Sequence, residues 1–166
     1  MKNGNQKPIV KRIGHYLYKL VPIADETGKI ISHAITPLMV EFHPRDLMQI
    51  IVGASVLAVP VAFTEETWNL GQELPLRNVL LLTLISFIFI ASYVYYNFYR
   101  FQLRNNLFRY VVRVLSIYLF SLMVVAMLLM IINRCPWQTD ALLAIKRVII
   151  VAFPASMSAA ISDTIK

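Results

Sequence analysis

Two adjacent carboxylates, Glu65 and Glu66, stand at the end of a long apolar run. A carboxylate near the bilayer is costly unless it faces protein or a water path, so the pair is a candidate functional site. Pro60, inside the run, removes one backbone hydrogen bond. Freed carbonyls, two carboxylates and the neighbouring Thr64 hydroxyl suit a hard cation or a hydrated ion. These residues predict an ion pathway. The alternative is that Pro60 is a packing kink and the glutamates form a wet helix end.

Composition places the chain in a membrane. Hydrophobic residues make up 58% of the chain and charged residues 15%, whereas soluble domains average about 45–50% and about 25%. Charges are scarce in four segments, roughly 47–64, 78–99, 111–133 and 147–163, each long enough to cross ~30 Å of hydrocarbon as a helix. Membrane β-strands would instead alternate over ~10 residues. We therefore predict an all-α membrane protein, with four transmembrane helices in residues 47–166 and a cytoplasmic segment in residues 1–46.

The basic residues are distributed unevenly about the predicted spans. Twelve of the 16 Lys and Arg residues lie on the side that holds both termini, and four lie on the other. The four are Arg77, Arg134, Lys146 and Arg147. Because cytoplasmic loops are enriched in Lys and Arg, we predict a multi-pass protein of the inner (plasma) membrane with both termini cytoplasmic. Lys146 and Arg147 are expected to snorkel outward from the start of the fourth helix.

The net charge of +7 does not indicate nucleic-acid binding. The basic residues flank the spans mainly on one side, which topology and attraction to anionic lipid already explain. The lipid bilayer is therefore the expected partner of these charges, and no nucleic acid is expected.

The N-terminal segment has strand and turn signals of its own. The apolar run Leu20–Ala24 is followed by Asp25–Lys29, a turn sequence, and then by the β-branched and apolar stretch Ile30–Phe42. This pattern predicts a small β-hairpin against the membrane face.

Two predicted spans carry faces of small residues and also contain proline. The faces are Ala54, Ala58 and Ala62 in the first span, and Ala152, Ser156 and Ala160 in the fourth. Small residues at helical spacing allow close helix approach, so we predict helix packing and subunit contact there. In a continuing helix, Glu65 and Glu66 would extend the first face, three and four positions after Ala62. The second face leads to Asp163, the predicted inner counterpart of the glutamates.

Catalytic chemistry has little support in the sequence. The chain has no paired His/Glu metal motif, no Cys/His dyad and no Gly-rich phosphate loop. The single cysteine, Cys135, is interpreted as an incidental loop thiol, with intermolecular pairing as the alternative. No enzyme activity, catalytic residue, bound metal or cofactor is predicted.

Several short motifs carry a family resemblance. They are Pro37, Pro44-Arg45-Asp46, Gly53-Ala54, Pro60, Phe63–Gly71 and Phe153-Pro154-Ala155-Ser156. The most specific is Pro-x-x-Phe-Thr-Glu-Glu-x-Trp-x-Leu-Gly, which begins at Pro60. From about residue 20 onward the chain resembles an uncharacterised prokaryotic family of integral membrane proteins, defined by a domain of unknown function. The resemblance implies a multi-span membrane protein and no activity. Longer members carry more spans, so this chain resembles a reduced form, which favours oligomerisation.

These observations favour a homo-oligomeric cation channel or passive ion pathway, with inorganic cations as its partners. The first helix would line the pore, and Glu65 and Glu66 would form an outer acidic ring that concentrates cations. Three alternatives stay open. The first is a non-conducting scaffold or accessory subunit whose N-terminal segment recruits a partner. The second is a proton-coupled carrier with Glu65 as a relay. The third and least supported is an enzyme acting on lipid.

Overall fold

The computed structural model describes residues 9–13, 16–24, 30–40, 44–99 and 107–165. The chain divides into two compact units, residues 1–42 and residues 43–166, and each is described by itself. The predicted boundary after residue 46 falls in the first turn of the first helix, α1 (Pro44–Ala62).

The first unit contains a three-stranded antiparallel sheet of order β1-β2-β3. Its strands are β1 (Ile9–Ile13), β2 (Tyr16–Ala24) and β3 (Ile30–Val40). The β2–β3 pairing runs from Tyr16 opposite Val40 to Ala24 opposite Ile30, with two register shifts. These two strands cover the region where a hairpin was expected, although the Asp25–Lys29 turn lies outside the described residues. The strand β1, paired with β2 from Ile9 opposite Leu20, was not predicted.

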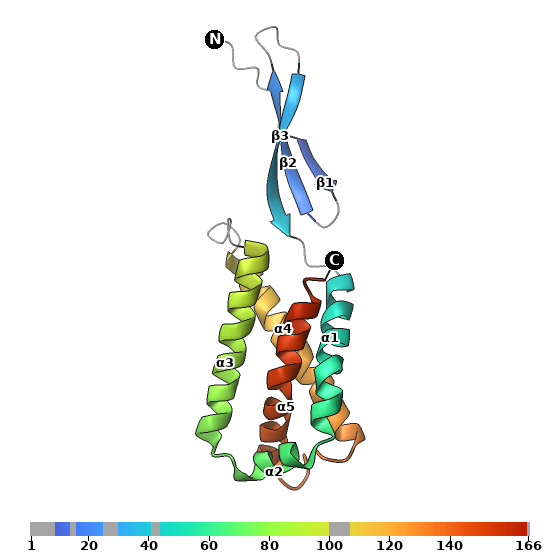
Figure 1. The fold of residues 1–166 in the computed structure, drawn as a ribbon, viewed down its shortest axis with the longest axis vertical. Coiled ribbons are helices and arrows are strands. Elements are labelled where there is room, and N and C mark those ends of the chain that lie inside the picture. Colours follow the sequence, from blue (N-terminus) through green and yellow to red (C-terminus); the bar gives the residue numbers. More distant parts are fainter. Residues whose placement is uncertain (1–8, 14–15, 25–29, 41–43, 100–106, 166) are drawn as a thin grey trace. The chain divides into compact units, whose positions relative to one another are not determined.

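The second unit is a helical bundle (Figure 1). Its helices are α1, α2 (Glu65–Glu73), α3 (Leu76–Val94), the π-helical turn η1 (Tyr95–Tyr99), α4 (Leu107–Ile131) and α5 (Ala141–Ser162). Within the described residues, four helices are long and apolar enough to cross a membrane: α1, α3 extended through η1, α4 and α5. This confirms the predicted all-α membrane fold with four spans. The short helix α2 was not predicted.

Local sequence explains where α1 ends. Pro44 stands at its first position, where the missing N–H costs no hydrogen bond. At its other end, the last carbonyls have no partners within the helix. The Thr64 hydroxyl donates to the Val61 carbonyl at 2.9 Å, and the Trp68 indole N–H donates to the Ala62 carbonyl at 2.8 Å. Two side chains of the following segment therefore terminate α1.

The connection from α4 to α5 also has capping residues. Asn133 has a φ of 55°, and the Arg134 N–H donates to the Leu129 carbonyl at 2.9 Å. A left-handed Asn with this bond pattern closes the C-terminus of a helix. The Asp140 side chain accepts a hydrogen bond from the Leu143 N–H at 2.9 Å and so caps the N-terminus of α5.

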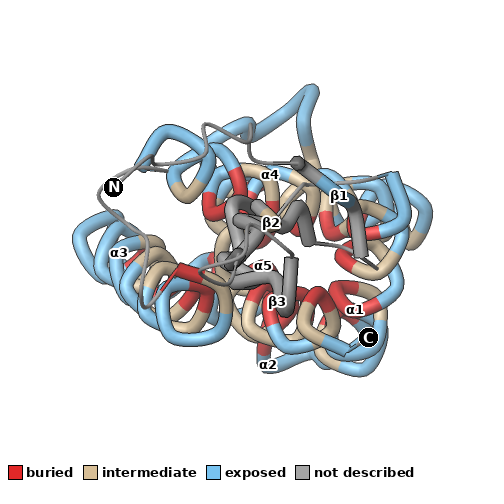
Figure 2. Tube along the Cα trace, turned by 90° about the horizontal axis from the view of Figure 1, so that it is seen from above, coloured by how far each residue is buried: buried red, intermediate tan, exposed pale blue. Residues whose placement is uncertain are grey.

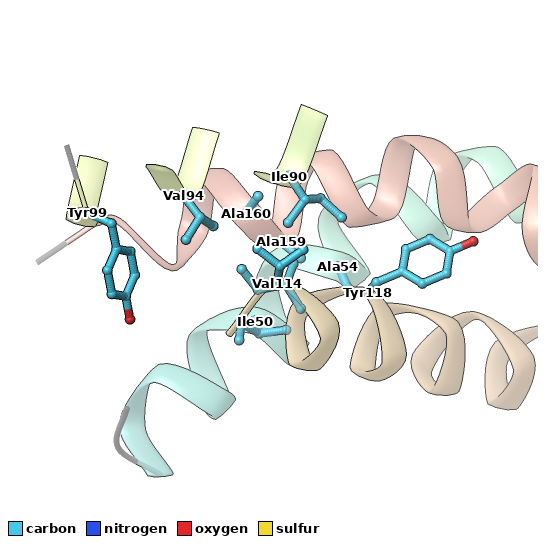
Figure 3. Packing of buried hydrophobic residues seen from close by; sticks show 10 residues of the cluster. Ile50, Ala54, Ile90, Val94, Tyr99, Val114, Tyr118, Ala159 and Ala160 are labelled. Atoms are coloured by element: carbon cyan, nitrogen blue, oxygen red, sulfur yellow. The ribbon is translucent and has the colours of Figure 1, made fainter. Parts of the chain in front are cut away.

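Helix α5 is central to the bundle, since it contacts α1, α2, α3 and α4. Figure 2 shows buried residues gathered where α1, α4 and α5 meet. One part of the core contains Ile50, Ile90, Val94, Val114 and Ala159, which come from α1, α3, α4 and α5 (Figure 3). The outward faces of α1, α3, α4 and α5 carry large exposed apolar residues, as expected of helices in contact with lipid.

The two small-residue faces pack within one chain. Ala54, Ala58, Ala62, Ala152, Ser156 and Ala160 are all fully buried, with 0% exposure. They lie along the most extensive helix–helix contact of the bundle, that of α1 with α5. A Cβ at Gly53 would overlap the Ser162 Cβ, so the backbones approach closely there. Within one chain the facing helix covers these side chains, which accounts for the small residues without a second copy. The predicted contact between subunits stays a prediction.

Candidate functional site: charged clusters at the two ends of the bundle

The first cluster, the Arg113 cluster, is formed by Asp46, Arg113, Asp163 and Phe98. The Arg113 Nε and Nη2 donate to the two carboxylate oxygens of Asp163 at 2.8 and 2.9 Å. Its Nη2 also lies 3.7 Å from an oxygen of Asp46. The exposed fraction of Arg113 is 1%, that of Asp46 is 1% and that of Asp163 is 0%. The cluster is therefore a buried guanidinium shared between two carboxylates.

Helix ends bring these side chains together. Asp46 is in the first turn of α1, Asp163 directly follows α5, and Arg113 lies one to two turns into α4. The π-helical turn η1 supplies Phe98, whose ring centroid lies 3.8 Å from the Arg113 guanidinium carbon. The π-helical turn continues α3 beyond its last residue, Val94. Here the turn places an aromatic face against the cation, which is a favourable arrangement.

Physical chemistry allows two roles for such a cluster. In the first role, ionisable residues inside membrane spans line ion paths or proton relays. In the second role they pair with one another, which is structural. Removing one partner of a buried pair is strongly destabilising because it leaves an uncompensated charge. The fork-to-fork geometry of Arg113 and Asp163 fixes relative orientation as well as charge. Because it joins α4 to the end of α5, it also sets the relative position of those two helices.

The structure revises the sequence interpretation of this end. Asp163 was predicted to face an ion pathway, but it is fully buried and bound to Arg113. Asp46 was noted only in the Pro44-Arg45-Asp46 motif, and it lies 3.7 Å from the Arg113 guanidinium. Arg113 entered the sequence analysis only among the twelve basic residues on the side of the termini, although it lay inside the predicted span 111–133. A charge inside an apolar segment needs a partner, and this signal could have found the pair.

The second cluster, the α2 clamp, is formed by Trp68, Gly71, Arg134, Lys146 and Arg147 at the opposite end of the bundle. The Arg147 side chain donates to the Arg134 carbonyl at 2.8 Å and to the Trp68 carbonyl at 3.3 Å. Lys146 Nζ donates to the Leu74 carbonyl at 2.7 Å. The Arg134 guanidinium carbon lies 3.8 Å from the centroid of the Trp68 ring. These contacts attach the α2 segment to the start of α5.

The clamp gives a structural reason for Lys146 and Arg147, two of the four basic residues on the side predicted to face away from the cytoplasm. Lys146 and Arg147 were predicted to snorkel toward water, but they bind backbone carbonyls, and Arg147 is only 8% exposed. Lys146 binds the carbonyl of Leu74, the C-cap of α2, where a cation is favourable. At Gly71 a Cβ would lie 2.6 Å from Arg147 Cγ, so the arginine stem runs over the glycine.

The glutamates lie in the first turn of α2. Helix α1 ends at Ala62, so Glu65 and Glu66 do not extend its small-residue face, contrary to the sequence interpretation. Both are exposed. Acidic residues in a first helical turn are stabilised by the helix dipole, which gives them a structural reason independent of ions. Thr64 bonds to Thr67 at 2.7 Å between hydroxyl oxygens, and Pro60 is an exposed residue inside α1.

Cys135 lies in the α4–α5 connection beside the clamp. Burial raises the pKa of its thiol, and the positive charge of Arg147 opposes part of that change. A raised pKa keeps the thiol neutral and weakly reactive. Among the described residues, no group of three or more His, Cys, Asp or Glu side chains is arranged to hold a metal ion.

Comparison with known proteins gives one family. Residues 25–164 match the family described as "Putative integral membrane protein (DUF2391)". No curated protein and no solved structure gives a significant match to the chain.

Proposed function

Since the chain belongs to the DUF2391 family of integral membrane proteins, we propose that it is a non-conducting membrane scaffold or accessory subunit. In this proposal the helical unit is the anchor, and the N-terminal unit of residues 1–42 recruits a protein partner. No reaction is assigned to the chain.

The observation that carries the proposal is the packing of α1. Its small-residue face is fully buried against α5. Beyond its first turn its exposed positions are apolar, with Met48, Val52, Val56, Leu57 and Val59 all at least 38% exposed. A water-filled pathway along α1 would be lined by these residues, and ions would lose hydration there without replacement ligands. The same residues are well suited to acyl chains.

Ion flux separates an anchor from a channel. Purified full-length protein is reconstituted in liposomes that hold a cation-sensitive dye, and an ionophore shows that the dye responds. The proposal expects dye signals equal to those of protein-free liposomes for Na⁺, K⁺ and H⁺ gradients. Cation flux that scales with protein density would overturn it.

Partner recruitment needs a second measurement, made in native membranes with the intact chain. A photo-crosslinking residue is placed at Lys11, an exposed position of β1, and in a control protein at Val56, an exposed position of α1. We expect a discrete adduct of defined mass with a second protein from position 11 and not from position 56. Equal labelling at both positions, or none at position 11, contradicts recruitment by the N-terminal unit.

A cation pathway is the second candidate, favoured by the exposure of Glu65 and Glu66 in one helical turn. In a homo-oligomer these carboxylates would form a ring that raises the local cation concentration. The doubly substituted Glu65→Gln/Glu66→Gln protein tests it. Flux that is present in the wild type and lost, or made less salt-sensitive, in the double variant supports the ring. Unchanged rate and selectivity exclude it.

We also propose that both termini face the cytoplasm. Twelve of the 16 basic residues favour this orientation, and Lys146 and Arg147, which argued against it, bind carbonyls within the bundle. An Asn5→Cys protein in a Cys135→Ser background tests it. A membrane-impermeant thiol reagent should label position 5 only after the membrane is opened. Labelling from outside intact cells would reverse the orientation.

A further inference from the structure

Two hollows adjoin at Trp137 on the α4–α5 side of the bundle. The first, of about 370 Å³, is a groove in the two helices and is lined mainly by aliphatic side chains. Its lining is Leu122, Met123, Ala126, Trp137, Ile145, Val148 and Ile149. The second, of about 430 Å³, lies where α4 ends, and its polar lining includes Asn133, Gln138 and Thr139. Both volumes fall in the ~300–1,000 Å³ range of ligand pockets.

The position of each hollow limits what can fill it. The apolar groove lies within two candidate membrane spans, so its surroundings are acyl chains. The polar hollow lies in the connection after α4, at the depth where a span meets headgroups. Trp137, 39% exposed, lines both hollows. A tryptophan with an apolar body and one N–H donor is the residue type favoured at that boundary.

The polar side chains of the second hollow indicate the headgroup. Asn133 and Gln138 are neutral amides that offer both donors and acceptors, and Thr139 adds a hydroxyl. The nearby Arg134 guanidinium is stacked on Trp68 of the α2 clamp. A neutral lining of this kind can donate to a phosphate and accept from an ammonium group, whereas a purely anionic headgroup would favour a cationic lining.

We propose that this site holds one zwitterionic phospholipid, such as a phosphatidylethanolamine. One acyl chain lies in the groove between α4 and α5, the glycerol backbone lies against Trp137, and the headgroup lies among Asn133, Gln138 and Thr139. The site is independent of whether the protein conducts ions or recruits a partner.

Lipid retention tests the groove with a matched pair of substitutions. Met123 and Met127 are one turn apart on α4, with exposures of 46% and 52%, but only Met123 lines the groove. Full-length wild-type, Met123→Trp and Met127→Trp proteins are released from vesicles of equal phosphatidylethanolamine and phosphatidylglycerol. Native mass spectrometry then counts the retained lipids. We expect one phosphatidylethanolamine on the wild type and on Met127→Trp, and retention at least about tenfold weaker on Met123→Trp.

Fluorescence provides a second readout, in which two brominated lipids are also compared on the wild-type protein alone. Vesicles with brominated acyl chains on the ethanolamine lipid should quench more wild-type emission than Trp137→Phe emission, because Trp137 touches the chain. Brominated glycerol lipid should quench Trp137 less. Equal quenching by both lipids, or equal retention by all three proteins, overturns the site. Preferential retention of phosphatidylglycerol overturns the headgroup assignment, and a dimer lost in Met123→Trp without bound lipid assigns the groove to a second copy.

Discussion

The two ends of the helical bundle hold charge in different ways. At the Arg113 cluster a buried cation meets side-chain carboxylates, with Asp163 at 2.8 Å and Asp46 at 3.7 Å. At the α2 clamp Arg147 and Lys146 meet backbone carbonyls at 2.7 to 3.3 Å. The three glutamates of α2, Glu65, Glu66 and Glu73, remain exposed. One end is joined by ion pairs and the other by side chain-to-backbone bonds.

This difference determines how strongly a substitution of the cation destabilises each end. Removing the cation from the Arg113 cluster leaves full charges in a buried place, which costs more than leaving dipoles. Removing a cation from the clamp leaves carbonyl groups near the membrane surface, where water can replace the donor. The Arg113 cluster should therefore control the stability of the whole bundle, and the clamp should control the order of α2.

The largest effect is expected for Arg113→Met. Loss of the cation should lower the free energy of unfolding by about 3–5 kcal/mol, because Asp163 and Asp46 stay buried. Thermal unfolding and steric trapping in detergent measure it. Arg109→Met, at an exposed position on the same helix, is the control and should change stability by less than about 0.5 kcal/mol. Adding Asp163→Leu to Arg113→Met should recover part of the loss. Equal stability of the Arg113 and Arg109 variants would contradict a stabilising role of the Arg113 cluster.

A smaller effect is expected for Arg147→Met at the α2 clamp. The Arg134 and Trp68 carbonyls lose their donor, which costs about 0.5–1.5 kcal/mol because water can replace part of the lost bonding. Amide hydrogen exchange over Glu65–Glu73 should accelerate more than exchange in α4. Arg77→Met, an exposed position at the start of α3, should leave exchange unchanged. If exchange accelerates uniformly through the bundle, the two ends do not differ as described.

Gly53 and Gly71 differ in the atoms that an added Cβ would contact. A Cβ at Gly53 meets Ser162 Cβ, which is fixed to a helix backbone, whereas one at Gly71 meets the flexible Arg147 stem. Gly53→Ala should therefore destabilise the bundle by about 1–3 kcal/mol through overpacking. Gly71→Ala should destabilise less than Gly53→Ala, because Arg147 Cγ must shift but the gain in helix propensity offsets part of that cost. Ser162→Gly should rescue Gly53→Ala in a double-mutant cycle, and a failure to rescue would place the strain elsewhere.

The smallest effect concerns the thiol beside the clamp. Because burial raises the pKa of Cys135 above its usual 9.0, less thiolate exists at any given pH, and the thiolate is the reactive form. Alkylation of Cys135 should be slow at neutral pH, and its rate should continue to rise beyond the pH where an ordinary thiol levels off. A Gln138→Cys thiol in a Cys135→Ser background, at an exposed position, provides the reference profile. Coincident pH profiles would contradict the raised pKa.

The sequence by itself determined the membrane fold and its spans. Segment length, apolar content and scarcity of charge predict helices because lipid leaves a spanning backbone few other ways to satisfy its hydrogen bonds. The small-residue faces on α1 and α5 were also visible at helical spacing. Their partner was not, because a small face fits another helix of the same chain as well as it fits a second subunit.

Only the tertiary structure decided which charges meet. Asp46, Arg113 and Asp163 are far apart in sequence, and they come together because an even number of antiparallel spans returns the chain to one end of the bundle. The start of α2 likewise depends on the hydrogen bond that the Trp68 indole N–H donates to the Ala62 carbonyl. Long-range partners of this kind leave no periodic trace in a single sequence. Periodicity reports which face of a helix is buried, whereas the arrangement of the helices determines what that face contacts.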